Sequence, residues 1–365
     1  MVTPVGRSKW ELDTPALCVE LTTMDRNIKK MSDIIVKQNG VGWRPHTKGQ
    51  KVPAVAWKEI DAGAFGVTCA KLGEAEVMAA AGIKDILIAN QIVGADKIAR
   101  LVNLRCHADV VVAVDSIENA RAIDAAAREK GVQVRVLLEV NTGMGRAGTD
   151  LGEPTVALYK QIVDLAGLKP SGVMGWEAHA TTVLDPAKKR EVVEKAVGGL
   201  VETAKMIRSA GMPAPIVSCG GTGTYWVSAT IPGVTEIQAG GGIFHDVHYS
   251  EHYGVDHEFA MTMMTTVTSR PNPTRIICDS GEKTMSSKMA VPRPLNLGKT
   301  ARVGLSAEHA RIELEEPNTT LKVGDKVEWI VGYSDFTTFL HEEMYVTRDG
   351  VVEQVWPVLG RGKLR

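Results

Sequence analysis

The chain has 365 residues and a formal net charge of −1, because 42 Lys and Arg balance 43 Asp and Glu. This balance excludes the strongly basic character of proteins that bind nucleic acid or an anionic membrane surface. The hydrophobic fraction, 44%, is ordinary for a globular protein. We therefore predict one barrel-sized domain and a smaller second domain, with no nucleic-acid or membrane partner.

Cysteine usage and the first residues bear on the compartment. Five cysteines are scattered along the chain, odd in number and without C-x-x-C spacing. This pattern argues against a disulfide framework and against a zinc ribbon. Residues 1–10 lack the apolar core of a signal peptide, and no apolar run approaches the roughly 18 residues of a membrane span. These features favour a reducing, cytoplasmic environment.

Short apolar runs alternate with helical patterns up to about residue 239. A first strand is expected over residues 14–21, followed by a helix with Thr23 as its cap. Further strands are expected at 64–69, 85–89, 108–114, 132–140, 168–174, 216–218 and 236–239. Helices are expected at 71–81, 95–105, 116–131, 155–166 and 185–210. Apolar strands joined by helix-sized crossovers are typical of parallel sheets, and the count predicts an α/β fold, a (β/α)8 barrel of the TIM type.

The character of the sequence changes near His257. Threonine and valine become frequent, helical patterns nearly vanish, and Pro or Gly turns separate short strands. This part of the chain is therefore predicted to be an all-β module.

Residues 43–51 (WRPHTKGQK) place three cations and a histidine between a strand and a helix. Pro45 fixes its own φ and favours an extended Arg44, so the strand is expected to end here. Lysine beside other cations and partly desolvated loses its proton more easily, and a neutral amine is what a Schiff base requires. Taken alone, such a cluster is more often a solvated surface.

The same stretch resembles the R-P-H-x-K-x-x-K motif of the D-threonine aldolase and D-serine dehydratase family. These are fold-type III pyridoxal phosphate (PLP) enzymes related to the alanine racemases. In that family the lysine of H-x-K carries the cofactor, so the resemblance implies Lys48 as the attachment site, with Lys51 as the second choice. It also implies that the N-terminal strand pairs with the β module. The expected domains are a PLP-binding barrel, residues 22–256, and a β-strand domain, residues 1–21 and 257–365.

Two glycine-rich segments follow late strands. Residues 217–225 (VSCGGTGTY) can close backbone N–H groups around an anion, where barrel enzymes often bind phosphate. They resemble the family's S-G-G-G-T-G-S-Y segment, and residues 238–249 (QAGGGIFHDVHY) resemble Q-x-G-S-Y-x-F-x-D-x-x-Y. The resemblance implies that the cofactor-binding residues are Gly221, Thr222, Gly223, Gly240, Gly241 and Tyr249.

Two further segments concern the substrate side. Residues 139–148 resemble E-I-x-x-G-x-x-R-x-G, which implies Arg146 near the cofactor ring or the substrate carboxylate. A surface arginine held by a glycine turn is the alternative. Residues 175–179 match G-x-Q-A-Y except that His179 replaces the tyrosine over the cofactor. His179 is a candidate proton carrier, or a structural histidine bonded to a backbone carbonyl.

The family's metal site, H-C-D-P-T or H-A-C-P-T, departs here. Residues 332–337 (GYSDFT) keep Asp335 at the second ligand position, but Tyr333 replaces the histidine. A protonated phenol is a poor ligand compared with imidazole. We therefore predict that the standard site does not hold the divalent metal of the relatives (Mg, Mn or Zn). A second, weaker candidate is the histidine cluster His245, His248, His252 and His257.

The resemblance implies a lyase that cleaves a small β-hydroxy-D-amino acid by retro-aldol chemistry through a Lys48 Schiff base. A homodimer is expected on the same grounds. The alternatives are a D-serine or 3-hydroxyaspartate type dehydratase, and an amino-acid racemase. A PLP-homeostasis protein without turnover fits less well, since such proteins resemble the barrel alone.

Overall fold

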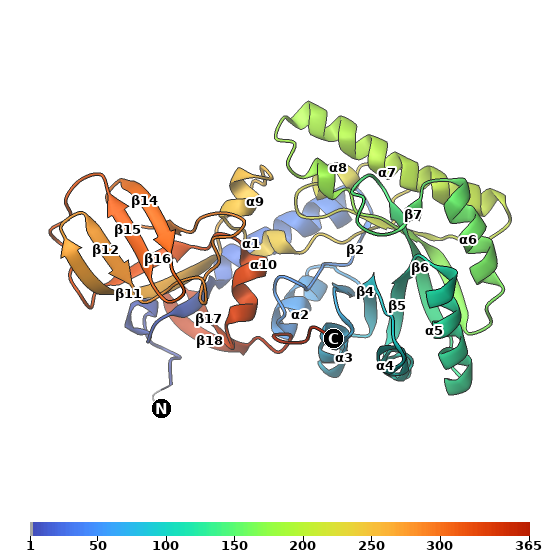
Figure 1. Cartoon of the computed structure of the whole chain (residues 1–365), viewed down its shortest axis with the longest axis horizontal. Helices are drawn as coiled ribbons and strands as arrows, with labels where there is room; N and C mark the ends of the chain where they lie inside the picture. The colour runs from blue at the N-terminus through green and yellow to red at the C-terminus, as the bar shows by residue number, and fades with distance from the viewer. Residues whose placement is uncertain (1–2) are drawn as a thin grey trace. The chain divides into compact units, whose positions relative to one another are not determined.

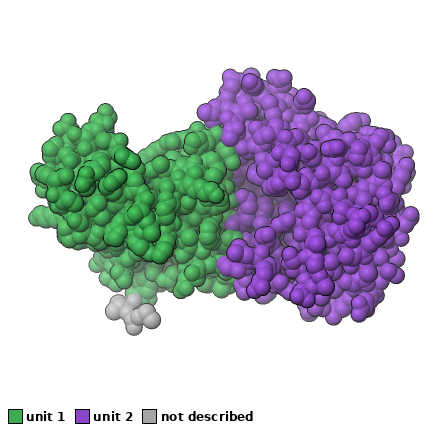
Figure 2. All heavy atoms as spheres, in the orientation of Figure 1, with its two compact units in different colours: residues 1–28, 49–52, 241–361 green, residues 29–48, 53–240, 362–365 purple. Residues whose placement is uncertain are grey.

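The computed structural model describes residues 3–365. Two compact units share the chain, and both are assembled from separate stretches of sequence (Figure 2). The barrel unit comprises Lys29–Lys48, Pro53–Gly240 and Gly362–Arg365. The β unit comprises the described residues up to Ile28, then Gly49–Val52 and Gly241–Arg361.

Eight parallel strands form the central sheet of the barrel unit, in the order β2-β10-β9-β8-β6-β5-β4-β3. Their bounds are β2 (Gly42–Trp43), β3 (Val67–Cys69), β4 (Asp85–Gln91), β5 (Asp109–Val114), β6 (Val134–Asn141), β8 (Leu168–Met174), β9 (Ile216–Cys219) and β10 (Glu236–Ile237). The short β7 (Thr149–Asp150) pairs with β6.

Hydrogen bonds also join the two ends of this strand order. The N–H of Phe65 donates to the Trp43 carbonyl at 3.1 Å, and the N–H of Thr68 donates to the Pro45 carbonyl at 2.8 Å. The predicted barrel of eight parallel strands is thereby confirmed. Its strands are almost continuously apolar because helices and barrel interior bury both faces, as β5 illustrates with Val110–Val114 fully buried.

Helices cover the outside of the barrel, where α4, α5 and α6 lie against the strands (Figure 1). Their bounds are α2 (Pro53–Asp61), α3 (Leu72–Ala80), α4 (Ala95–Arg105), α5 (Ile117–Lys130), α6 (Glu153–Val163), α7 (Pro186–Ser209) and α8 (Tyr225–Ser228). Ser116 caps α5 by accepting a hydrogen bond from the N–H of Asn119, and the left-handed Gly131 ends that helix, in agreement with the helix predicted over residues 116–131.

The first helix differs from the prediction. α1 (Leu21–Ser32) starts directly after the first strand, so Thr23 lies inside the helix and is not its cap. The helix then continues as a π-helical segment, Asp33–Gln38. Wider turns of this kind are rare in helices, and no sequence pattern used here distinguishes them from α-helix.

The β unit is built on strands from both ends of the chain. Its sheet runs in the order β14-β15-β12-β11-β1-β17-β18; in addition β16 pairs with β11, and β13 pairs with β16. The bounds are β1 (Ala16–Glu20), β11 (Met261–Asn272), β12 (Arg275–Cys278), β13 (Arg293–Pro294), β14 (Thr300–Leu305), β15 (Ala310–Leu314), β16 (Lys326–Ile330), β17 (Glu343–Arg348) and β18 (Val351–Pro357). Two short helices, α9 (Val247–Glu251) and α10 (Ser334–Thr337), complete the unit.

The N-terminal strand is central to this sheet, as the sequence led us to expect. Cys18 pairs with Thr262 on one side, antiparallel, and with Tyr345 on the other, parallel. The short helix α10 within the β-rich part was not predicted. Within residues 3–365, no helix has both the length and the apolar character needed to cross a membrane. All five cysteines carry free thiols.

Candidate active site

Lys48 follows β2 at the end of the barrel where the parallel strands finish. Its N–H donates to Nδ1 of His46 at 3.3 Å, and the N–H of Thr47 donates to the Thr68 carbonyl at 2.7 Å. The segment that carries Lys48 is therefore tied to β3. Loops at this end of a parallel barrel form the active site in barrel enzymes.

The other two cations of residues 43–51 have different surroundings. The Arg44 side chain, 2% exposed, pairs with the carboxylates of Asp85 and Glu236. Arg44 is thus neutralised, and its predicted role as an uncompensated positive neighbour of Lys48 is wrong. Lys51 belongs to the β unit, has φ of 57°, and accepts a hydrogen bond from the N–H of Gly360 at 2.9 Å through its carbonyl.

A tight glycine turn follows β9. The carbonyl of Gly221 accepts hydrogen bonds from the N–H groups of Thr224 and Tyr225, at 3.0 and 2.9 Å. The N–H groups of Thr222 and Gly223 donate to no other group in the described part of the chain. Two adjacent backbone donors are therefore available at the turn.

Trp176, directly after β8, supplies a third donor beside this turn. Its Nε1 atom is buried and has no acceptor within residues 3–365. A Cβ atom on Gly221 would lie only 2.7 Å from that nitrogen, so only glycine fits at this position. An unsatisfied buried N–H is unfavourable, and the donor set suits an oxyanion such as the phosphate of PLP.

Glu177 holds the turn from behind. Its carboxylate is 0% exposed and accepts hydrogen bonds from the hydroxyls of Thr224 and Ser228, both at 2.6 Å. It also accepts one from the N–H of Gly220 at 3.3 Å. This role was not predicted, because in residues 175–179 the departure at His179 was the more prominent feature. The available signal was an acidic residue where the family has glutamine.

Arg146 and His179 lie on two neighbouring loops, after β6 and after β8. The Arg146 guanidinium is 3.4 Å from the Glu139 carboxylate and lies over the Trp176 ring, 5.4 Å from its centroid. His179 is exposed and packs on Gly143 of the loop after β6, where a Cβ would lie 2.9 Å from its Cε1. Arg146 is therefore connected through Trp176 to the glycine turn, whereas His179 lies on the loop surface.

The second glycine segment divides between the two units. In the barrel unit, a Cβ on Gly240 would collide with the backbone of His46, two residues before Lys48. In the β unit, Gly241 lies against the hydroxyl of Tyr249, which also donates to Oδ1 of Asp335 at 3.3 Å. Burial raises the pKa of Tyr249, so its phenol stays protonated and donates.

The residues at the family's metal position do not fit a divalent cation. Burial, together with the charge of Asp335, raises the pKa of the Tyr333 phenol, so this residue offers no anionic ligand. Within residues 3–365 no three His, Cys, Asp or Glu side chains are arranged to hold a metal ion.

The weaker prediction, a metal site at the histidine cluster, is also wrong, because these histidines are not arranged around one point. His245 stacks on Phe259 with ring centroids 4.8 Å apart, and His257 Nδ1 is 2.8 Å from the Gly242 carbonyl. His248 packs edge-on against Tyr333 at 5.0 Å. These histidines serve packing rather than a shared ligand set.

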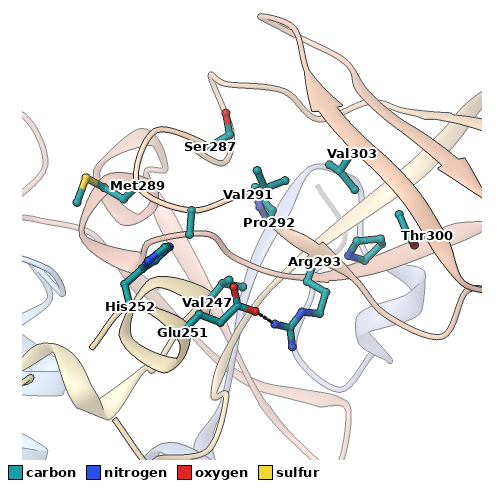
Figure 3. A pocket seen from close by; sticks show the side chains of 12 residues that line it. Val247, Glu251, His252, Ser287, Met289, Val291, Pro292, Arg293, Thr300 and Val303 are labelled. Carbon is teal, nitrogen blue, oxygen red and sulfur yellow. Dashed lines mark hydrogen bonds and ion pairs between the residues drawn. The ribbon is translucent and has the colours of Figure 1, made fainter. Parts of the chain in front are cut away.

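A separate cavity of about 490 Å³ opens in the β unit beside α9 (Figure 3). Its walls are mainly apolar, and an ion pair between Arg293 and Glu251 crosses one side. His252 of the histidine cluster lines this cavity, but none of the predicted cofactor-binding or catalytic residues does.

Comparison with known proteins agrees with this arrangement. The chain matches the family "Alanine racemase, N-terminal domain" over residues 19–246 and "Putative serine dehydratase domain" over residues 260–347. It is 31% identical to a D-threonine aldolase of Arthrobacter sp., over 96% of this chain and 93% of that protein. It is 32% identical to a D-threo-3-hydroxyaspartate dehydratase of Delftia sp. (strain HT23), over 77% of this chain and 75% of that protein.

A solved structure extends the likeness to the whole fold. The D-threonine aldolase from Filomicrobium marinum superimposes with a TM-score of 0.95 at 30% identity, covering 100% of both chains. The relatives are named aldolases and dehydratases, which are lyases, and PLP is the cofactor expected for an alanine racemase-like fold. The chain is therefore an enzyme that belongs to the alanine racemase-like family of lyases that includes D-threonine aldolase and serine dehydratase.

Proposed function

We propose that this enzyme is a PLP-dependent lyase that cleaves a small β-hydroxy-D-amino acid by retro-aldol chemistry, with Lys48 as the residue that binds the cofactor. The observation that carries the cofactor assignment is the set of three N–H donors without partners, from Thr222, Gly223 and Trp176. These donors lie in or beside the glycine turn after β9, at the same end of the barrel as Lys48. The likeness to aldolases over the full chain supports the reaction type.

The chain's own residues would divide the work. Bound PLP supplies an electron sink for negative charge at the substrate Cα. The glycine turn and Trp176 hold the phosphate, and Gly240, Gly241 and Tyr249 complete the cofactor site. Arg146 orients the ring or the substrate carboxylate with its permanent positive charge.

The proton of the β-hydroxyl needs an acceptor, and in this proposal the acceptor is a side chain and not a group bound to a metal ion. We assign this role to Nε2 of His179, because a neutral imidazole accepts protons near pH 7. It is exposed on the loop after β8 and packs against Gly143 of the neighbouring loop that carries Arg146, so we propose that the substrate can reach it. In this proposal Asp335 is a hydrogen-bond partner of Tyr249 and not a metal ligand.

Dehydration of a 3-hydroxy-D-amino acid is the second candidate, favoured by the match to the dehydratase from Delftia sp.. It differs from aldol cleavage in its products, since it releases ammonia and a keto acid. Racemisation would leave the carbon skeleton intact and exchange the Cα hydrogen with solvent.

A substrate panel separates these reactions. The purified enzyme with added PLP is incubated with D-threonine, D-phenylserine and 3-hydroxy-D-aspartate in deuterated water, and the products are identified by mass spectrometry. Glycine and an aldehyde are expected. Ammonia and a keto acid would favour the dehydratase, deuterium in otherwise unchanged substrate would favour a racemase, and an unchanged panel would contradict all three.

Attachment of the cofactor is tested separately. Borohydride treatment fixes a carbonyl cofactor irreversibly to its lysine, and peptide mapping then locates it. We expect the label on Lys48, its loss in Lys48→Ala, and its retention in Lys51→Ala, which is the matched control. A label on Lys51 would overturn the assignment.

Domain limits and assembly complete the proposal. We propose that residues 22–256 act as the PLP-binding barrel domain and that residues 1–21 and 257–365 form the β domain.

We further propose that the enzyme is a homodimer, as expected for its family. Light scattering on the eluted protein would report twice the chain mass of 39.3 kDa, whereas a single-chain mass would contradict the dimer.

A further inference from the structure

Lys189 is a lysine in an unusual place. Its residue is 3% exposed, although its neighbours Lys188 and Arg190 in the first turns of α7 are both exposed. Lysine is seldom fully buried unless specific contacts hold its amine. The burial of this one side chain therefore calls for a local explanation.

The contacts of its amine connect two loops at the strand ends. Nζ of Lys189 donates to the carbonyl of Thr181, in the loop after β8, at 3.1 Å. It also donates to the carbonyl of Gly223, in the glycine turn after β9, at 3.1 Å. The third neighbour is Trp226 of α8, whose ring centroid lies 5.1 Å away.

The bond to Gly223 acts on the part of the turn that matters for phosphate. Gly223 carries one of the two backbone N–H groups without a partner, and Thr222 carries the other. The N–H of Gly223 belongs to the preceding peptide group, so fixing the carbonyl of this flexible residue anchors it from one side and limits how far the adjacent donors can move. Glu177 fixes the opposite end of the turn through Gly220 and Thr224.

We propose that Lys189 is a positioning residue for the cofactor phosphate, which holds the Gly223 carbonyl so that the N–H groups of Thr222 and Gly223 face the phosphate. Its ammonium also places a positive charge at the Gly223 carbonyl, next to these donors. This inference rests on the proposed function, because it requires PLP phosphate in the turn.

The charge is expected to matter because the site is partly screened from water. Electrostatic interactions strengthen where the local dielectric constant is low. A phosphate monoester carries up to two negative charges, and the buried carboxylate of Glu177 behind the same turn would disfavour it. Lys189 is the cation on this turn that offsets the carboxylate.

The experiment compares two ligands that differ only in the phosphate. Full-length wild type and variants are freed of PLP, and the dissociation constants of PLP and pyridoxal are measured by absorbance titration. Lys189→Met removes the bonds and the charge, whereas Lys189→Gln keeps an N–H donor without the charge. Lys188→Met is the matched control, since it removes an adjacent but exposed lysine.

In Lys189→Met we expect PLP to bind about 10-fold more weakly or worse, the size of a lost charged hydrogen bond, while pyridoxal binding stays within about twofold. Lys189→Gln should fall between this variant and wild type, and Lys188→Met should match wild type. A purely structural role of Lys189 would not change the ratio of the two constants.

Two results would overturn the inference. One is PLP affinity in Lys189→Met equal to that of wild type, and the other is an equal loss for PLP and pyridoxal. If Lys189→Met does not fold, the ratio in Lys189→Gln decides. Failure of wild type to bind PLP at all would instead contradict the proposed function.

Discussion

The carboxylate of Asp335 lies directly against the backbone of Gly49, the residue that follows Lys48 in the chain. A side chain at position 49 would collide with Oδ1 of Asp335. Asp335 can therefore approach this part of the backbone only because Gly49 has no side chain. Tyr249 holds the same oxygen from its other side through a hydrogen bond of 3.3 Å. Asp335, the aspartate at the family's metal position, is thus packed against Gly49, the residue next to Lys48.

Replacing Gly49 by alanine should disturb this contact. The added methyl group overlaps Asp335, and such overpacking destabilises a core by about 1–3 kcal/mol. We expect a lower urea midpoint for Gly49→Ala. Gly198→Ala is the control, because a Cβ there meets no atom within 4 Å and should leave the midpoint unchanged or higher. Equal midpoints for wild type and Gly49→Ala would contradict the contact.

Tyr333 is expected to make the enzyme independent of divalent metal. Chelation with EDTA should leave wild-type activity within about twofold, since a protonated phenol does not replace an imidazole ligand. Tyr333→His restores the spacing of the family's site and should bring about one equivalent of metal per chain, measured by mass spectrometry of the digested protein. Tyr333→Phe, the control, should gain none. Activity that EDTA abolishes in wild type would contradict this prediction.

Glu177 is expected to stabilise the glycine turn. In Glu177→Ala the hydroxyls of Thr224 and Ser228 lose their 2.6 Å bonds to the carboxylate and keep only longer ones to backbone carbonyls, a loss that destabilises a fold by about 1–3 kcal/mol. Thermal unfolding should show a clear loss for Glu177→Ala and a smaller one for Glu177→Gln, whose amide oxygen still accepts. Glu191→Ala, an exposed position on α7, should unfold like wild type.

Lys189 predicts a pH dependence of stability. Burial lowers its pKa to about 8 in the folded chain, below the ordinary lysine value of 10.5. The unfolded chain therefore binds more protons between these values, and stability from this group rises as the pH increases from 8 toward 10. Urea titrations should show wild type gaining stability relative to Lys189→Met over that range.

The pH experiment needs attention to other charges near Lys189. Asp185 and Arg190 lie on the same helix, and Glu177 faces the glycine turn that Lys189 contacts. These groups are unchanged in Lys189→Met, so the difference between the two proteins isolates the amine. Parallel stability curves from pH 7 to pH 10 would contradict the prediction.

The barrel could be predicted from the sequence because its signal is local. Each strand is an apolar run of a few residues and each helix has its own period and caps, as Ser116 and Gly131 show for α5. The predicted start of α1, after a Thr23 cap, is three residues too late, since Leu21 directly continues from the strand and no capping residue marks the change.

Contacts between distant residues could not be predicted in this way. Arg44 looked like a cation beside Lys48, but its partner Glu236 is 192 positions away in the sequence. Lys189 stands between Lys188 and Arg190 and has the pattern of an exposed helix surface. Only the fold brings the Gly223 carbonyl to its amine. The positions of Lys48 and the glycine turn were predicted because a family motif marks them.

The pairing of β1 has a consequence for how the protein is made. β1 leaves the ribosome long before its partner β11, which begins more than 240 residues later, since Cys18 pairs with Thr262. At ordinary rates of synthesis the strand waits on the order of 10–50 s before that partner appears. During this time an apolar strand has two open edges, which invite pairing with other nascent chains. Expression of the barrel as a fragment should therefore begin after β1, because the retained strand would promote aggregation.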